Sequence, residues 1–72
     1  MNMDYVSLVE TAAEARHEDP IPRAYIIEVL DMVDRGEAKV KRYPLGVPCL
    51  RSVFEIAKKL HAEKHADEMA RR

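Results

Sequence analysis

The stretch from Arg23 to Arg35 constrains the fold more than any other part of this 72-residue sequence. At about 100° per residue, its apolar side chains fall on one helical arc roughly 160° wide. Pro22 suits the first helical position, because proline lacks the N–H that would go unpaired there, and Gly36 can adopt the left-handed conformation that closes a helix. The stretch therefore predicts a buried helix around which the chain is organised, with a core face of Tyr25, Ile26, Val29, Leu30, Met32 and Val33.

The length of the chain limits the core that this helix can share. A chain of this size forms one domain and buries only about 60% of its extended surface. Its single cysteine excludes an internal disulfide. We therefore expect one small domain over residues 1–72 with marginal stability, for which association into a homodimer is a natural remedy.

Two further amphipathic segments flank the central one. We expect a first helix over residues 4–16, followed by the tight, proline-containing connection His17–Pro22, which should make the first two helices neighbours. The third helix is expected to start at Pro48, and its apolar arc ends at Leu60 although helix-forming residues continue to the C-terminus. Residues 61–72 are therefore expected to overhang the body as a helical tail. The predicted fold class is all-α, a small three-helix domain with a long C-terminal helix.

A basic loop or short strand is expected between the second and third helices. Residues 37–43 alternate weakly between small apolar and basic side chains, a pattern that indicates a short extended strand or one arm of a small hairpin. Lys39, Lys41 and Tyr43 would share one side of that segment, and a turn would follow at Gly46.

The net charge of −1 conceals an uneven distribution. Residues 1–34 carry two basic and eight acidic side chains, and residues 35–72 carry ten basic and five acidic ones. Such a division favours either attraction between the two halves or two faces with different electrostatic partners. The sequence has no apolar run of membrane-spanning length and no start typical of a signal peptide, so we expect a cytoplasmic protein without a membrane partner.

Two groups of residues could carry chemistry. His61, His65 and Glu68 stand at i, i+4 and i+7 on one helical face, where they either ligate a transition metal or remain solvated on a polar helix end. Cys49, near the start of the third helix, could have a pKa lowered by the helix dipole. No base, glycine-rich loop or oxyanion site accompanies it. We therefore expect no enzyme activity and no cofactor, and we keep a metal or thiol site as an alternative.

The basic segment over residues 35–51 is the strongest functional signal. Lysine and arginine side chains on an exposed turn before a helix can contact phosphates, and the N–H groups of the helix start add further donors. The candidate nucleic-acid contacts are Lys39, Lys41, Arg42 and Arg51.

A helix that ends at Gly36, a basic wing position at residues 39–42 and a turn at Gly46 follow one another in this segment. This order resembles the winged helix-turn-helix of phage excisionases and related regulators. The resemblance covers residues 23–60 and implies a DNA-binding regulator. The acidic helix 23–35 departs from that pattern, since phosphates would repel it and its exposed face lacks side chains that read bases.

A chain this small without a catalytic set is typical of accessory or inhibitor-type proteins, including those encoded by phages and mobile elements. We therefore predict a small, non-catalytic regulatory or adaptor protein that acts by binding another macromolecule, with a protein as its partner. The alternatives are a DNA-binding or excisionase-like regulator that uses residues 35–51, and the metal or thiol site. The predicted protein contacts are Glu10, Glu14, Glu28, Asp31 and Tyr43.

Overall fold

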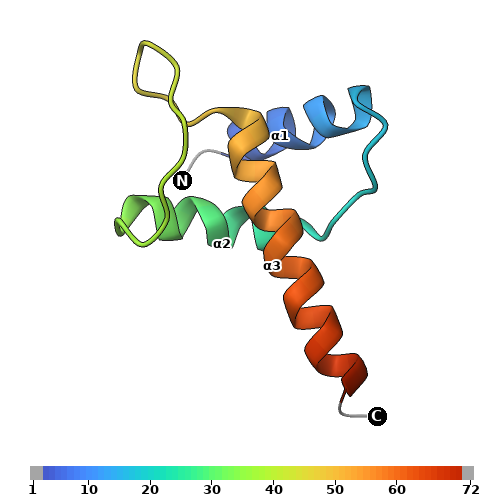
Figure 1. Cartoon of the computed structure of the whole chain (residues 1–72). Helices are drawn as coiled ribbons and strands as arrows, with labels where there is room; N and C mark the ends of the chain where they lie inside the picture. The colour runs from blue at the N-terminus through green and yellow to red at the C-terminus, as the bar shows by residue number, and fades with distance from the viewer. Residues whose placement is uncertain (1–2, 71–72) are drawn as a thin grey trace.

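Three helices and one projecting loop make up the domain (Figure 1). The computed structural model describes the backbone of residues 3–70 and the side chains of residues 5–66. The helices are α1 (Met3–Ala15), α2 (Arg23–Asp34) and α3 (Leu50–Ala70). The predicted all-α, three-helix architecture is confirmed. No helix within residues 3–70 has the length and hydropathy needed to cross a bilayer.

The core draws small and medium-sized apolar side chains from all three helices. Its largest member is Phe54, which is 1% exposed, and no side chain among the described residues is both polar and buried. Half-buried residues surround this centre, including Ala38 and Val40 of the loop. The buried set is Val6, Val9, Ala13, Ile26, Val29, Val33, Val53, Phe54 and Ala57.

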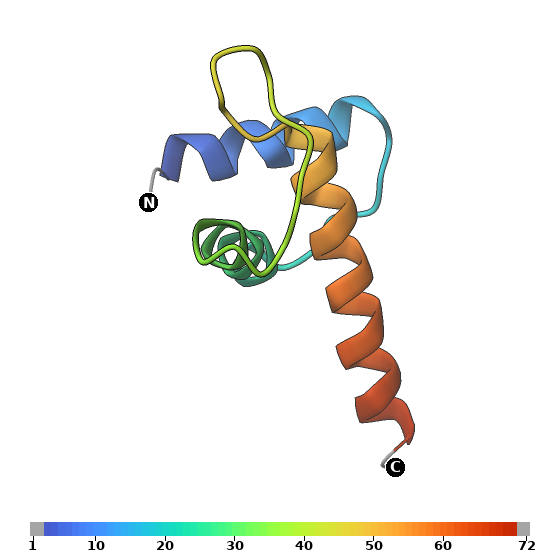
Figure 2. The ribbon, with the colours of Figure 1, turned by 60° about the vertical axis from the view of Figure 1, so that its left-hand side comes forward.

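The central position belongs to α3 and not to α2. Both α1 and α2 pack more extensively on α3 than on each other, and Figures 1 and 2 show α3 crossing the other two helices. The connection over residues 16–22 accounts for this arrangement. Because it contains two prolines, it runs extended past α3 and does not close α1 tightly onto α2.

Ion pairs hold this connection against α3. The carboxylate of Glu18 lies 3.2 Å from the Arg16 guanidinium and 3.1 Å from the Lys58 ammonium. Hydrogen bonding to Lys58, supported by Arg16, lowers the pKa of Glu18 below its ordinary value. The Arg16 guanidinium also lies 5.8 Å from the centre of the Phe54 ring, so the connection covers one side of the core.

Two helix ends close in the same way with different residues. After α2, Gly36 has φ +77°, and the Gly36 and Glu37 N–H groups donate to Val33 and Met32, which is the Schellman arrangement. After α1, the N–H groups of His17 and Glu18 donate to the equivalent carbonyls of Glu14 and Ala13. There the left-handed position, at φ 59°, is occupied by His17. Few residues other than glycine adopt this conformation without strain.

The helix boundaries differ from the predicted ones by one or two residues. Pro22 has ψ 135°, which is extended, so it precedes α2 as its N-cap. Pro48 pairs with Arg42, and the Cys49 N–H donates to the Lys41 carbonyl, so residues 48 and 49 belong to the loop. Helix α3 therefore begins at Leu50 and not at Pro48.

The C-terminal part of α3 extends beyond the other two helices (Figure 1). His61 is half-buried, and its ring lies edge-on to Tyr25 at 5.0 Å between centroids. Lys64 forms an ion pair with Glu28 at 3.3 Å. From residue 62 to residue 66 every side chain is exposed, so contact with α2 ends within this turn.

Replacing His17 with glycine should stabilise the domain by roughly 0.5–1 kcal/mol, because glycine removes the steric cost of the left-handed conformation. Urea denaturation of wild type and His17→Gly gives the measurement. Gly36→Ala is the matched control and should destabilise the domain, because its positive φ strains any residue with a Cβ. No steric clash adds to this strain, since a Cβ at Gly36 would meet no atom within 4 Å. A less stable His17→Gly variant would contradict this account of the helix end.

Replacing Phe54 with alanine should cost about 3–5 kcal/mol. Since small domains have a total stability of about that size, the cooperative thermal transition followed by circular dichroism should disappear. Leu45→Ala is the control, because Leu45 is 93% exposed and its truncation should leave the melting temperature unchanged. A cooperative melt in Phe54→Ala near the wild-type temperature would mean that the core lies elsewhere.

Candidate macromolecule-binding surface

The loop between α2 and α3 is a small β-hairpin over residues 41–49. Arg42 and Pro48 form an antiparallel bridge, flanked by hydrogen bonds from Tyr43 N–H to Val47 O (2.9 Å) and from Cys49 N–H to Lys41 O (2.8 Å). The sequence predicted at most a short strand here. The structure confirms a turn at Gly46 and adds the second arm, which the sequence analysis had assigned to a turn and the helix start.

The hairpin turn uses the residues that its geometry requires. Gly46 N–H donates to the Tyr43 carbonyl at 2.8 Å, and Gly46 has φ +86°. A three-residue loop that ends in a left-handed glycine is a common way to close a hairpin. The Arg42 guanidinium donates to the Gly46 carbonyl at 2.8 Å. The tip is therefore held by both backbone and side-chain hydrogen bonds.

The base of the hairpin is attached to α1. The Tyr5 hydroxyl donates to the Pro48 carbonyl at 2.7 Å, across 43 positions of the sequence. Burial, with smaller effects from Tyr43 and Cys49, raises the pKa of Tyr5 to about 12. A hydrogen bond donated by a half-buried phenol fixes where the hairpin leaves the body.

Large apolar side chains are exposed on this hairpin. Leu45 is 93% exposed, Tyr43 46% and Val47 44%. Among the other described residues, the only exposed large hydrophobic side chain is Leu8 of α1. Isolated exposed leucines are ordinary, but a group of them on one projecting element is typical of interaction sites. Figures 1 and 2 show the hairpin standing clear of the three helices.

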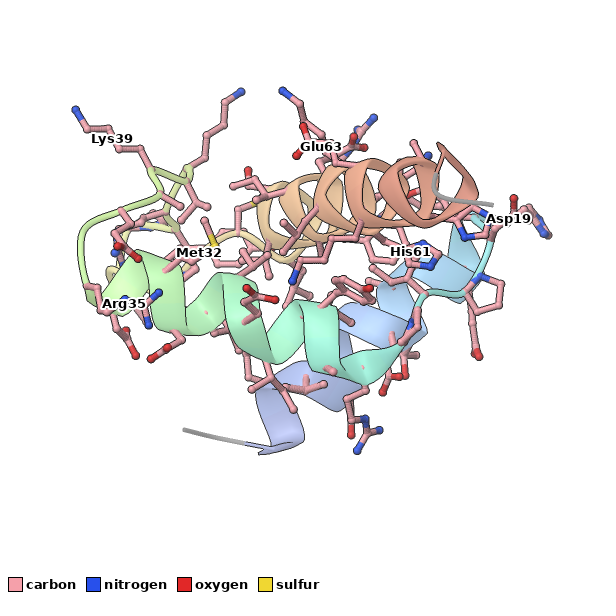
Figure 3. The ribbon with its side chains drawn as sticks, turned by 90° about the horizontal axis from the view of Figure 1, so that it is seen from below. Asp19, Met32, Arg35, Lys39, His61 and Glu63 are labelled. Atoms are coloured by element: carbon pink, nitrogen blue, oxygen red, sulfur yellow. The ribbon has the colours of Figure 1, made fainter. Side chains whose placement is uncertain are left out.

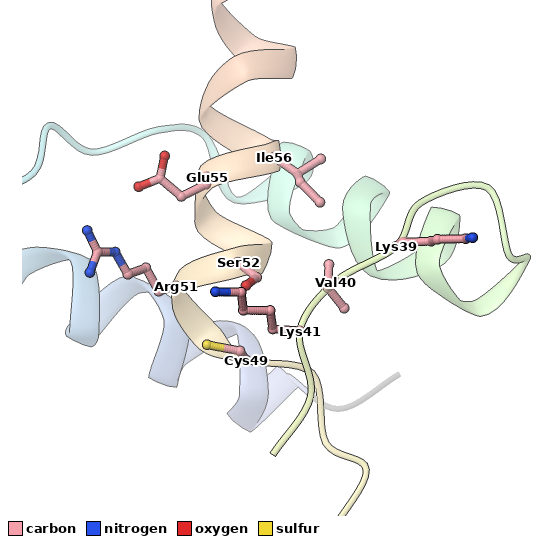
Figure 4. A pocket seen from close by; sticks show the side chains of 8 residues that line it. All are labelled: Lys39, Val40, Lys41, Cys49, Arg51, Ser52, Glu55 and Ile56. Atoms are coloured by element: carbon pink, nitrogen blue, oxygen red, sulfur yellow. The ribbon is translucent and has the colours of Figure 1, made fainter. Parts of the chain in front are cut away.

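An open groove of about 670 Å³ lies between residues 39–41 and the first two turns of α3 (Figure 4). Lys41 extends across it towards α3, Lys39 points away from α3, and Arg51 lies on the far side. Val40 and Ile56 provide apolar walls. Figure 3 shows Lys39 extending from the body at the end opposite His61.

Cys49 borders this groove at the N-cap of α3. The hydrogen bond from the Ser52 backbone N–H lowers the pKa of the Cys49 thiol. Partial burial raises this pKa, but the Arg51 N–H and the Ser52 and Tyr43 side chains lower it further, so the pKa lies below its ordinary value. The direction agrees with the dipole argument from the sequence. The structure adds the atoms responsible.

The predicted acidic contacts are largely engaged within the chain. Glu10 pairs with Arg23 at 2.5 Å, Glu28 pairs with Lys64 at 3.3 Å, and Asp31 pairs with Arg35. Glu14 remains exposed and has no ion-pair partner among the described side chains. A partner that used Glu10, Glu28 or Asp31 would compete with these internal cations.

The histidine cluster meets α2 and is not isolated. The rings of His61 and His65 stack at 6.1 Å between centroids, and His61 also contacts Tyr25. The side chain of Glu68 lies outside the described residues. Within the described part of the chain, no group of three histidine, cysteine or acidic side chains is placed to hold a metal ion. The contacts here are those of a packed helix face.

The predicted nucleic-acid contacts lie just before the hairpin, on it and on α3, and the apolar neighbours Leu45 and Val47 were not among the predicted site residues. Leu45 had been predicted to lie in a turn with Gly46, and Val47 to be extended because it precedes Pro48. The weak alternation of residues 37–43 allowed one arm of a hairpin but gave no signal for the second arm or for the exposure of the tip. Nothing in the local sequence could have indicated the hydrogen bond from Tyr5, since it joins distant segments.

Comparison of the chain with protein-family models, with curated proteins and with solved structures gives no match. The site is therefore interpreted from its own geometry.

Replacing Tyr5 with phenylalanine should destabilise the domain by about 0.5–1.5 kcal/mol at neutral pH by removing one hydrogen bond. Because the folded state raises the pKa of Tyr5 from 10.0 to about 12, its stabilising contribution is complete below pH 10 and is lost between pH 10 and pH 12. Urea denaturation across that range should show wild type and Tyr5→Phe converging in stability. A constant difference between them up to pH 12 would contradict this role.

Proposed function

We propose that this protein is a small, non-catalytic regulatory or adaptor protein that binds another protein through its 41–49 hairpin. The observation that carries the proposal is the exposure of Tyr43, Leu45 and Val47 on an element fixed at its tip and base. Aromatic and aliphatic anchors of this kind supply much of the binding energy at protein interfaces. A hairpin that is already ordered loses little conformational entropy when it binds.

A second candidate function is DNA binding, and one observation favours it. The predicted nucleic-acid contacts form no ion pair with a described carboxylate, so their charges can meet phosphates. These residues are Lys39, Lys41, Arg42 and Arg51. The exposed apolar tip argues for the protein partner, since phosphates offer no apolar surface to Leu45.

The proposal predicts that the hairpin tip is required for partner capture. Tagged protein is incubated with lysate of the cells that produce it, and the captured protein is identified, purified and titrated against wild type and the double variant Tyr43→Ser, Leu45→Ser. Loss of anchor residues should weaken binding by roughly tenfold or more. Leu45 is 93% exposed and Tyr43 46%, and neither belongs to the buried core, so the double variant should keep a cooperative thermal transition.

Leu8→Ser is the matched control, because Leu8 is a 56% exposed leucine on α1. It should bind the captured protein as wild type does. Equal binding by the double variant, capture that Leu8→Ser abolishes instead, or capture of no protein would each contradict a hairpin-centred interface.

A further inference from the structure

Among the side chains of residues 5–66, the basic groups without an internal ion pair lie around the hairpin and at one position on α3. Five of the basic side chains described form ion pairs within the chain; they are Arg16, Arg23, Arg35, Lys58 and Lys64. The basic side chains without such a pair among the described residues are Lys39, Lys41, Arg42, Arg51 and Lys59. The fold thus leaves its free cations concentrated beside the groove.

The groove itself combines charge with apolar surface. Lys39, Lys41 and Arg51 line it, and Glu55 is the acidic residue that opposes them. Val40 and Ile56 lie between Lys39 on one side and Lys41 with Arg51 on the other (Figure 4), and they pack partly against the core. A ligand that fits must therefore present negative charge at its edges and apolar groups between them.

We propose that this groove binds an acidic, amphipathic segment of the protein partner, whose carboxylates meet Lys41 and Arg51 on the α3 side of the groove. The inference rests on the proposed function and adds the chemistry of the partner. The lysine comes from the hairpin strand and extends to α3, which carries the arginine (Figure 4). Carboxylates would form charge-assisted hydrogen bonds with both groups, and the partner's apolar side chains would cover Ile56.

Nucleic acid fits the groove less well than an acidic peptide. Duplex DNA presents phosphates over a long surface and needs a broad basic stripe. Here Glu55 lies in the groove, and the exposed Asp31 and Asp34 stand on the last turns of α2, which precedes the hairpin.

The test is an amide chemical-shift titration of the isotope-labelled full chain with three probes. The first is a short synthetic peptide of glutamates interspersed with leucines. The second has lysine in place of each glutamate, and the third is a short duplex DNA of mixed sequence. We expect saturable shifts in residues 39–41 and 51–56 with the glutamate peptide, weakened by added salt, and no saturable shifts with the lysine peptide.

The double variant Lys41→Glu, Arg51→Glu should bind the glutamate peptide roughly tenfold or more weakly, because reversed charges repel its carboxylates. Lys59→Glu is the matched control, since Lys59 is an exposed cation outside the groove, and it should bind nearly as wild type does. Tighter saturable binding of DNA than of the glutamate peptide would overturn the inference, as would glutamate-peptide shifts that map outside the groove.

The protein captured through the hairpin separates this inference from the proposed function. If the charge-reversed variant binds that protein as wild type does, while the tip variant does not, the groove assignment is wrong and the hairpin proposal stands. If both variants lose binding while Lys59→Glu retains it, the groove and the tip form one interface.

Discussion

The burial of Phe54 among three helices is the interaction on which the rest of this structure depends. The other core residues are valines, alanines and one isoleucine, each of which buries less apolar surface. Because Phe54 belongs to α3, that helix becomes the surface on which α1 and α2 both pack. Its ring also lies under the Arg16 guanidinium, which brings the 16–22 connection onto the core.

Outside the core, ion pairs make further contacts between the helices and the connection over residues 16–22. They join segments far apart in sequence, as in Lys58 with Glu18 and Lys64 with Glu28. Individually, exposed pairs of this kind contribute little to stability. Their main consequence is electrostatic, because each pair cancels a cation that would otherwise extend the basic region. Within residues 5–66, most of the basic side chains left without an ion pair therefore lie beside the hairpin.

The helices were predictable because the helical spacing of apolar residues agrees with the positions of proline and glycine at the helix ends. Gly36 and the apolar spacing of residues 23–34 fixed α2 almost to the residue. The missing information was of two kinds. His17 closes α1 in a left-handed conformation that is uncommon for histidine, so the sequence does not predict it. The Tyr5–Pro48 hydrogen bond and the ion pairs to α3 join residues far apart in the sequence, so they depend on the tertiary structure. The basic residues of the site were found from composition, whereas the apolar tip needed knowledge of the hairpin.

Leu45 connects the fold with the proposed function. A leucine that is 93% exposed contributes almost no burial to folding, and the turn geometry around it depends on Gly46 and on the hydrogen bonds of Tyr43. Folding therefore gives no reason for an apolar residue at this position. Its surface can be buried only by something outside this domain. The neighbouring cations and the groove would then set the charge of whatever covers it, which favours a partner that is apolar at its centre and acidic at its edge.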